Sequence, residues 1–154
     1  IKRIDIISAE EMLHAALSAF PDSTIAILSA AVADYRPAEA SDIKIKKQEL
    51  TLNLALVKTV DILATLGKKK KRGQILVGFA LETNNEVENA VGKLEKKNLD
   101  FIVLNSLRDD GAGFKNDQNK VTIIDNKLSK ESFLLKSKRD VAKDICKKVL
   151  DLLS

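Results

Sequence analysis

The most regular feature of the chain is a series of short apolar runs separated by amphipathic stretches. The runs from Ile25 to Leu28, Ile75 to Phe79 and Phe101 to Leu104 lack polar alternation, which is typical of strands covered on both faces by helices. Ile4 to Ile7 predicts one more short strand. We therefore expect an α/β fold, a doubly wound, Rossmann-like and mostly parallel sheet with right-handed crossovers, in which the 25–28 strand is central.

Helices are predicted between these strands by apolar positions that recur with the helical period. The first begins at Ser8, whose spacing to Glu11 fits a capping box. A short helix is expected from Asp61 to Leu66. The remaining predicted elements are a helix with apolar positions Val87, Ala90, Val91 and Leu94, a β-hairpin between Lys120 and Lys136, and a final helix capped by Ser137.

The pattern changes between residues 43 and 57. Leucines alternate with smaller or polar residues from Leu50 to Leu56, as in a half-buried antiparallel strand, and Ile43 to Lys47 is predicted as its hairpin partner. Nothing local in the sequence covers the apolar face of this hairpin. We therefore predict an inserted β-hairpin that acts as a dimerisation arm, within a single domain over residues 1–154.

Composition narrows the class of protein. A chain of 154 residues with 45% hydrophobic residues fits one domain, and no apolar run approaches the roughly 18 residues of a membrane span. The single cysteine, Cys146, cannot form an internal disulfide, so we expect a cytoplasmic protein. A net charge of +4 with 4% aromatic residues argues against nucleic acid as a partner and favours small anionic ligands.

Several common kinds of site have no signature in the sequence. There is neither a Gly-x-Gly-x-x-Gly fingerprint nor a Walker loop, which disfavours a simple dehydrogenase or a P-loop enzyme. His14 is the only histidine and is expected at the surface, without a nucleophile beside it. No group of residues has metal-ligand spacing, so no metal site is predicted, and any metal would be a hard ion carried by a phosphate ligand.

Small and charged residues gather where the predicted strands end. The small residues from Ser29 to Ala33 lead into Asp34, and ligands of open α/β sheets lie beyond the carboxyl ends of strands. The lysines that follow in the chain suit phosphate binding: Lys44, Lys46, Lys47, Lys93 and Lys97. A structural alternative stays open, in which the hairpin lysines are solvated and the two helical lysines pair with Glu86, Glu88 or Glu95.

Six motifs in order resemble the phosphopantothenate-cysteine ligase (phosphopantothenoylcysteine synthetase) domain of bacterial coenzyme A biosynthesis. They are SAAVADYRP at 29–37, KIKK at 44–47, VGFALET at 77–83, the helical segment at 93–100, FIVLN at 101–105 and FKNDQN at 114–119. Each motif is weak alone, but the ordered set spans nearly the whole chain and is specific.

The resemblance implies a two-step ligation. CTP activates the carboxylate of 4'-phosphopantothenate as an acyl-cytidylate with release of diphosphate, and the amine of cysteine then displaces CMP. It further implies Mg2+ carried with the triphosphate and a homodimer, with the arm and a mobile flap at about residues 43–57. Many such domains accompany a flavin decarboxylase domain, fused or separate, and no FMN is expected in this portion.

The resemblance also assigns roles to individual residues. Lys44 is the predicted catalytic residue, at the phosphates. Ser29 and Ala30 would border the cytidine pocket through their backbone, and Asp34 would contact the base or ribose. The other predicted nucleotide contacts are Val60, Asp61, Ile62 and Leu63 around the start of the short helix, Phe79 against the nucleotide, and Lys93 and Lys97 at the triphosphate.

Two departures from the family pattern bear on activity. Thr59-Val60-Asp61 stands where the family usually has Asn-Pro-Asp. The family's opening segment, a strand, a Gly-rich turn and a loop that helps bind the acyl intermediate, has no counterpart here. We therefore expect weak or no activity unless that segment is supplied. The alternative from another class is a non-catalytic nucleotide-binding or dimerisation module that uses the same lysines.

Overall fold

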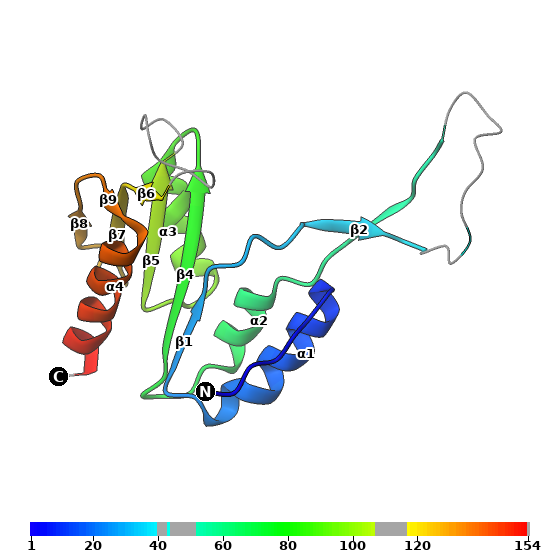
Figure 1. The fold of residues 1–154 in the computed structure, drawn as a ribbon, viewed down its shortest axis with the longest axis horizontal. Helices are drawn as coiled ribbons and strands as arrows, with labels where there is room; N and C mark the ends of the chain where they lie inside the picture. Colours follow the sequence, from blue (N-terminus) through cyan, green and yellow to red (C-terminus); the bar gives the residue numbers. More distant parts are fainter. Residues whose placement is uncertain (40–42, 44–51, 107–116, 154) are drawn as a thin grey trace.

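A five-stranded sheet forms the centre of the molecule (Figure 1). The computed structural model describes residues 1–39, 43, 52–106 and 117–153, and its sheet has the strand order β1-β4-β5-β7-β8. The strands are β1 (Ile25–Leu28), β4 (Ile75–Glu82), β5 (Phe101–Ser106), β7 (Val121–Asp125) and β8 (Lys130–Ser132). β1, β4 and β5 are parallel to one another, whereas β7 pairs antiparallel with both of its neighbours, β5 and β8. The α/β class is confirmed, but the sheet is mixed, because β7 runs antiparallel to β1, β4 and β5.

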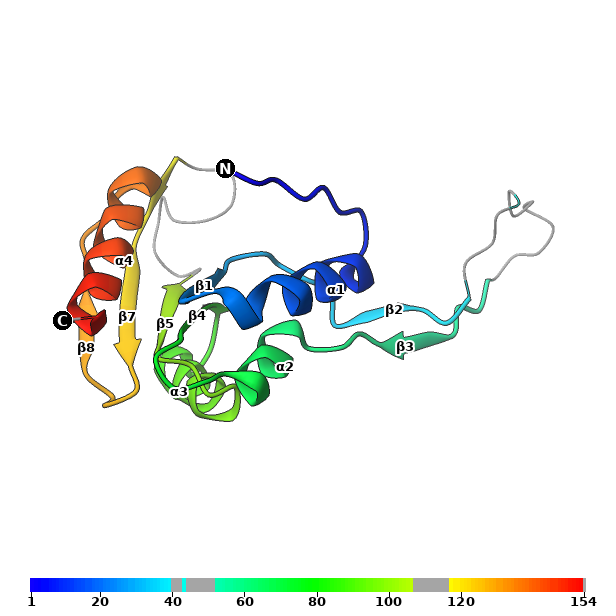
Figure 2. The ribbon, with the colours of Figure 1, turned by 90° about the horizontal axis from the view of Figure 1, so that it is seen from below.

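Helices cover both faces of this sheet. α1 (Ala9–Ala19), α2 (Ile62–Lys69) and α3 (Glu86–Lys96) pack on one face, and α4 (Lys138–Leu153) packs on the other (Figure 2). A short 3-10 helix, Phe20–Asp22, follows α1. Among the described residues, none of these helices combines the length and the apolar character needed to cross a membrane. The loops that follow β1 and β4 lie at the carboxyl ends of the parallel strands.

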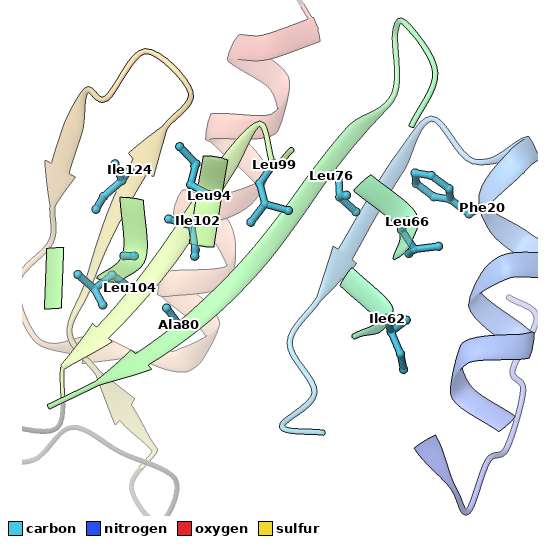
Figure 3. Packing of buried hydrophobic residues seen from close by; sticks show 11 residues of the cluster. Phe20, Ile62, Leu66, Leu76, Ala80, Leu94, Leu99, Ile102, Leu104 and Ile124 are labelled. Atoms are coloured by element: carbon cyan, nitrogen blue, oxygen red, sulfur yellow. The ribbon is translucent and has the colours of Figure 1, made fainter. Parts of the chain in front are cut away.

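Side chains of β4 divide the core in two. Leu76 and Ala80 face the three-helix layer, where Leu66 of α2 is also buried (Figure 3). Ile75 and Val77 point to the opposite face and pack in the cluster under α4. The 75–79 run has no polar position because β4 lies between two apolar layers and its side chains pack into both of them.

Three predicted helix starts are confirmed by side-chain caps. The hydroxyl of Ser8 accepts a hydrogen bond from the N–H of Glu11 at 3.1 Å, and the carboxylate of Asp61 accepts one from Ala64 at 2.9 Å. The hydroxyl of Ser137 accepts from the N–H of Asp140 at 3.1 Å. Each cap satisfies a backbone donor that has no partner within the first turn of its helix.

Two strand predictions are wrong. Residues 1–8 precede α1 without forming a strand, and Ile7 is exposed. β1 lies at the edge of the described sheet rather than at its centre, and one of its faces is open, with Ile25 38% and Ile27 45% exposed. The cause is that α4 packs against β4, β5 and β7, and its cluster contains no residue of β1.

The predicted arm begins as a two-stranded ribbon that extends away from the sheet (Figures 1 and 2). β2 (Tyr35–Pro37) pairs antiparallel with β3 (Leu56–Lys58). The predicted hairpin partner, Ile43 to Lys47, falls largely outside the described residues. Leu52, Leu54 and Leu56 are more than half exposed, so the leucine face is not covered by the described part of its own chain. The remaining strands, β6 (Gln118–Asn119) and β9 (Lys136–Ser137), pair beside the start of α4.

Replacing Gly67 by alanine should destabilise the fold. A Cβ at Gly67 would overlap the carbonyl oxygen of Lys97, which follows α3, so α2 and α3 would have to separate. We expect the free energy of unfolding in urea to fall by about 1–3 kcal/mol, the usual cost of overpacking. Gly92 on the open face of α3 is the matched control, because nothing lies within 4 Å of its added Cβ. Gly92→Ala should stabilise by about 0.5–1 kcal/mol. Equal effects of the two changes would contradict the close contact.

Candidate functional site

A cavity of about 130 Å³ lies beyond the carboxyl end of β1. The loop after β1 forms one wall and the start of α2 forms another. β4 and the end of α3 contribute the rest of the lining, and α1 contributes Met12. This position is the one where open α/β sheets bind their ligands. The volume is below the roughly 300 Å³ of a typical small-molecule pocket, so it would enclose part of a nucleotide rather than all of it.

Most of the predicted nucleotide contacts meet at this cavity, although they come from four separate segments of the chain. The predicted residues that line it are Ala30, Val60, Asp61, Ile62, Leu63, Phe79 and Lys97. The other lining residues are Met12, Leu28, Val32, Ala33 and Thr59. Two of the lining residues that follow β1, Ala30 and Ala33, have small side chains.

Three of the predicted residues that the structure describes do not line the cavity. Ser29 is exposed next to it, and Asp34 is exposed while its backbone carbonyl accepts a hydrogen bond from the N–H of Thr59 at 2.8 Å. Lys93 lies on α3, one helical turn before the C-cap residue Lys97. Lys44 falls outside the described residues. The bond between Asp34 and Thr59 joins the two loops that form the cavity walls.

Asp61 and Lys97 form the charged edge of the cavity. Oδ2 of Asp61 lies 3.0 Å from Nζ of Lys97, and the other carboxylate oxygen caps α2 through Ala64. Burial raises the pKa of Asp61, but the hydrogen bonds from Ala64 and Lys97, together with the charge of Lys96, outweigh burial and hold the pKa below its usual range. The carboxylate is therefore charged at neutral pH.

Lys93 has a carboxylate partner on another element as well. Its Nζ lies 2.6 Å from Oε1 of Glu82, the last residue of β4. The structural alternative expected both lysines to pair along their own helix, whereas the pairs observed here reach to β4 and to the turn before α2. Sequence reasoning did not select Glu82, although it stands inside the VGFALET motif.

A second, larger cavity of about 600 Å³ adjoins the first. The two share Met12, Ala30, Val32, Ala33, Thr59 and Val60. Arg36 and Lys58 of the arm ribbon and the exposed His14 of α1 also line the larger cavity. His14 is at the surface as predicted, but its place beside a cavity was not foreseen, because only the tertiary fold brings α1 to the loop after β1.

The hydroxyl of Thr59 is buried at the junction of the two cavities and has no hydrogen-bond partner among the described residues. Buried hydroxyl groups normally have one. In the sequence, Thr59 could have been singled out only because it stands where the family usually has the Asn of Asn-Pro-Asp.

Comparison with protein families identifies the chain. The profile described as DNA/pantothenate metabolism flavoprotein C-terminal domain matches residues 1–153. The chain belongs to this family. The resemblance inferred from the six motifs is therefore confirmed at the level of the family.

Individual members of the family are similar over almost the whole chain. The coenzyme A biosynthesis bifunctional protein CoaBC of Bacillus subtilis is 46% identical over 97% of this chain, and a cysteine/cysteine sulfinic acid decarboxylase from an unknown prokaryotic organism is 52% identical over 99%. The chain spans 36% and 43% of the lengths of these two proteins, respectively.

Solved structures share the fold. The crystal structure of the C-terminal domain of CoaBC superposes with a TM-score of 0.78 at 36% identity, and covers 97% of this chain and 67% of that one. The DNA/pantothenate metabolism flavoprotein of Streptococcus pneumoniae has a TM-score of 0.76 at 22% identity, over 97% of this chain and 72% of that one. The chain is thus homologous to the C-terminal domain of CoaBC.

Removing the ammonium group from Lys97 should raise the pKa of Asp61. In Lys97→Met the carboxylate keeps the bond from Ala64 but loses its charged donor. A carboxyl with a lowered pKa stabilises the fold above its unfolded pKa, and this contribution is lost as pH falls through the folded pKa. The acid-unfolding midpoint should therefore move to higher pH in the variant. NMR titration of the Asp61 carboxyl carbon measures the pKa directly, with Lys143→Met as a control. An unchanged titration curve in Lys97→Met would contradict the ion pair.

Proposed function

We propose that this chain is the CTP-binding portion of a ligase that joins 4'-phosphopantothenate to cysteine. The observation that carries the proposal is the cavity beyond β1, which is lined by seven of the ten nucleotide contacts that the family resemblance predicts. Homology to the C-terminal domain of CoaBC supports the same assignment. The activity is proposed for the longer ligase, because the chain spans 36% of the length of its Bacillus subtilis relative.

The nucleotide would bind mainly through backbone groups. Ser29 and Ala30 border the cytidine, Asp34 contacts the base or ribose, and Phe79 packs against the nucleotide. The N–H groups at the start of α2, next to Val60 and the residues after it, point to the cavity end of that helix, where the helix dipole favours negative charge. Lys97 and Lys93 add positive charge for the triphosphate, and Lys44 supplies the catalytic contact to the phosphates.

The larger cavity would receive 4'-phosphopantothenate. It adjoins the nucleotide cavity, and the apolar side chains of Ile6, Ile7 and Leu13 give it an apolar wall. Arg36 and Lys58 would bind the phosphate of this substrate, since both lie on its lining. The six residues shared by the two cavities would then lie where the carboxylate meets the nucleotide.

The reaction is two successive substitutions. A carboxylate oxygen of 4'-phosphopantothenate attacks the α-phosphorus of CTP, and the bond to the β-phosphate oxygen breaks, which releases diphosphate. The amine of cysteine then attacks the acyl carbon, loses a proton, and CMP leaves with the electrons of the acyl–oxygen bond. Positioned cations stabilise the charge that develops in the first step, and their removal costs on the order of a hundredfold or more in rate.

Magnesium would enter as a complex with the triphosphate. When bound, it neutralises phosphate charge during the transfer. Asp61 is the acidic residue on the lining of the smaller cavity, and its carboxylate is charged because of Ala64 and Lys97. A hard oxygen ligand of this kind fits Mg2+, which normally keeps only one or two protein carboxylates.

The arm would join two copies of the chain as a homodimer. Its leucines at 52, 54 and 56 are exposed in the single chain, and a repeated apolar face of this kind suits a self-complementary interface. The ribbon begins at Tyr35, directly after Asp34, so a dimer formed through the arm would lie next to the nucleotide site.

Release of diphosphate in the presence of CTP, 4'-phosphopantothenate and cysteine tests the proposal. The chain is assayed alone and fused behind the opening segment of the Bacillus subtilis relative, and turnover is expected in the fused protein. Lys97→Met in the fused protein should lower kcat/KM about a hundredfold, because it removes a cation at the phosphates. Lys143→Met on the outer part of α4 should leave it unchanged.

Absence of turnover in the fused protein would defeat the ligase assignment. If CTP still raised the thermal unfolding midpoint of such an inactive protein, the non-catalytic nucleotide-binding module would be the better description. A midpoint unaffected by CTP would reject both.

A further inference from the structure

Glu82 holds the ammonium group of Lys93 from the end of β4. Its side chain is only 12% exposed, and its Oε1 lies 2.6 Å from Nζ of Lys93. Its other oxygen accepts a hydrogen bond from Nδ2 of Asn89 at 3.2 Å. Each oxygen of this carboxylate therefore has a donor from α3.

Asn89 ties this carboxylate to the turn that joins β4 to α3. Its Nδ2 also donates to the backbone carbonyl of Asn84 at 2.8 Å, and its N–H donates to the carbonyl of Asn85 at 2.9 Å. Asn85 has a left-handed backbone, with φ of 46°. Glu82 is thus fixed by the strand, the turn and the first turns of the helix together.

The pair differs from an ordinary ion pair on a helix surface. A lysine side chain has many rotamers in solution, and an exposed partner restricts them little. Here the partner is largely buried and stands on a different element, 11 residues earlier in the chain. One ammonium hydrogen directed at Glu82 leaves two for another acceptor.

Lys93 lies one helical turn from a residue that lines the nucleotide cavity. That residue is Lys97, the C-cap of α3, and residues four apart share one face of a helix. Each of these lysines has a carboxylate partner from outside α3, Glu82 for Lys93 and Asp61 for Lys97. Two paired cations therefore stand one turn apart, and one of them lines the cavity.

We propose that Glu82 is a positioning residue that orients the ammonium of Lys93 toward the phosphates of the bound nucleotide. This inference rests on the proposed function, because it requires a nucleotide in the cavity. A negative charge near a triphosphate opposes binding in the ground state. The effect of Glu82 is therefore on the orientation of Lys93 during phosphate transfer, where a small misplacement lowers the rate strongly.

Glu82→Gln separates these two effects, because glutamine keeps the size and an acceptor oxygen but loses the charge. In the fused protein of the diphosphate assay we expect kcat to fall about tenfold, with KM for CTP unchanged or lower. Lys93→Met should lower kcat and raise KM for CTP. In the Lys93→Met background, Glu82→Gln should cause no further loss of kcat, because the residue acts through Lys93.

A control variant removes a comparable ion pair elsewhere. Asp144→Asn breaks the 2.7 Å pair between Lys136 and Asp144, which joins β9 to α4 on the other face of the sheet. This change should leave kcat within about twofold. Thermal unfolding of each variant checks that the proteins compared are folded.

Two results would overturn the positioning role. One is an equal fractional loss of kcat from Glu82→Gln in the presence and absence of Lys93, as a purely structural role would give. The other is a higher KM for CTP with unchanged kcat. Failure of the proposed function looks different, because the unaltered fused protein would then release no diphosphate from CTP.

Discussion

The close packing of α2 against the end of α3 is the constraint on which the candidate site depends. Gly67 allows it, because any side chain there would meet the carbonyl of Lys97, and the amide of Asn98 donates to the carbonyl of Gly67 at 2.9 Å. From this contact, α2 runs back about 9 Å to its cap at Asp61, at the usual rise of a helix. The side chain of Lys97 reaches that cap. One small residue thus brings a cation, a carboxylate and a helix start together.

The electrostatics of the site follow from this packing. Lys97 and Lys93 are not free charges, since each is paired with a carboxylate from outside its own helix. Such pairs keep long, flexible side chains in place before a ligand arrives, which is the condition under which charged groups contribute most to phosphate transfer. The carboxylates of these pairs also neutralise part of the positive charge of the two lysines. Backbone N–H groups at the start of α2 therefore contribute a larger share of anion binding.

Local signals in the sequence were sufficient for much of this structure. The caps at Ser8, Asp61 and Ser137 could be read from residue type and spacing, because a cap involves only the first turn of its own helix. The parallel strands followed from their unbroken apolar runs. The family resemblance likewise named seven of the twelve residues that line the cavity.

What sequence could not supply are the relations between distant segments. The apolar run of β1 indicates that both of its faces can be covered. It does not indicate that α4 does not cover Ile25 and Ile27, which are exposed. The partner of Lys93 is a residue of β4, and no helical period points to it. The larger cavity was not foreseen for the same reason, because the arm ribbon, α1 and the loop after β1 form it jointly.

The central claim is that a nucleotide triphosphate lies between the start of α2 and the lysines of α3. A crystal structure of the protein with CTP tests this most directly. The account predicts phosphate oxygens within about 3 Å of Nζ of Lys97 and of backbone N–H groups in the first turn of α2, with the cytidine beside Ala30. Phosphates bound instead at the basic turn of residues 68–72, with the cavity beyond β1 left without nucleotide, would contradict it.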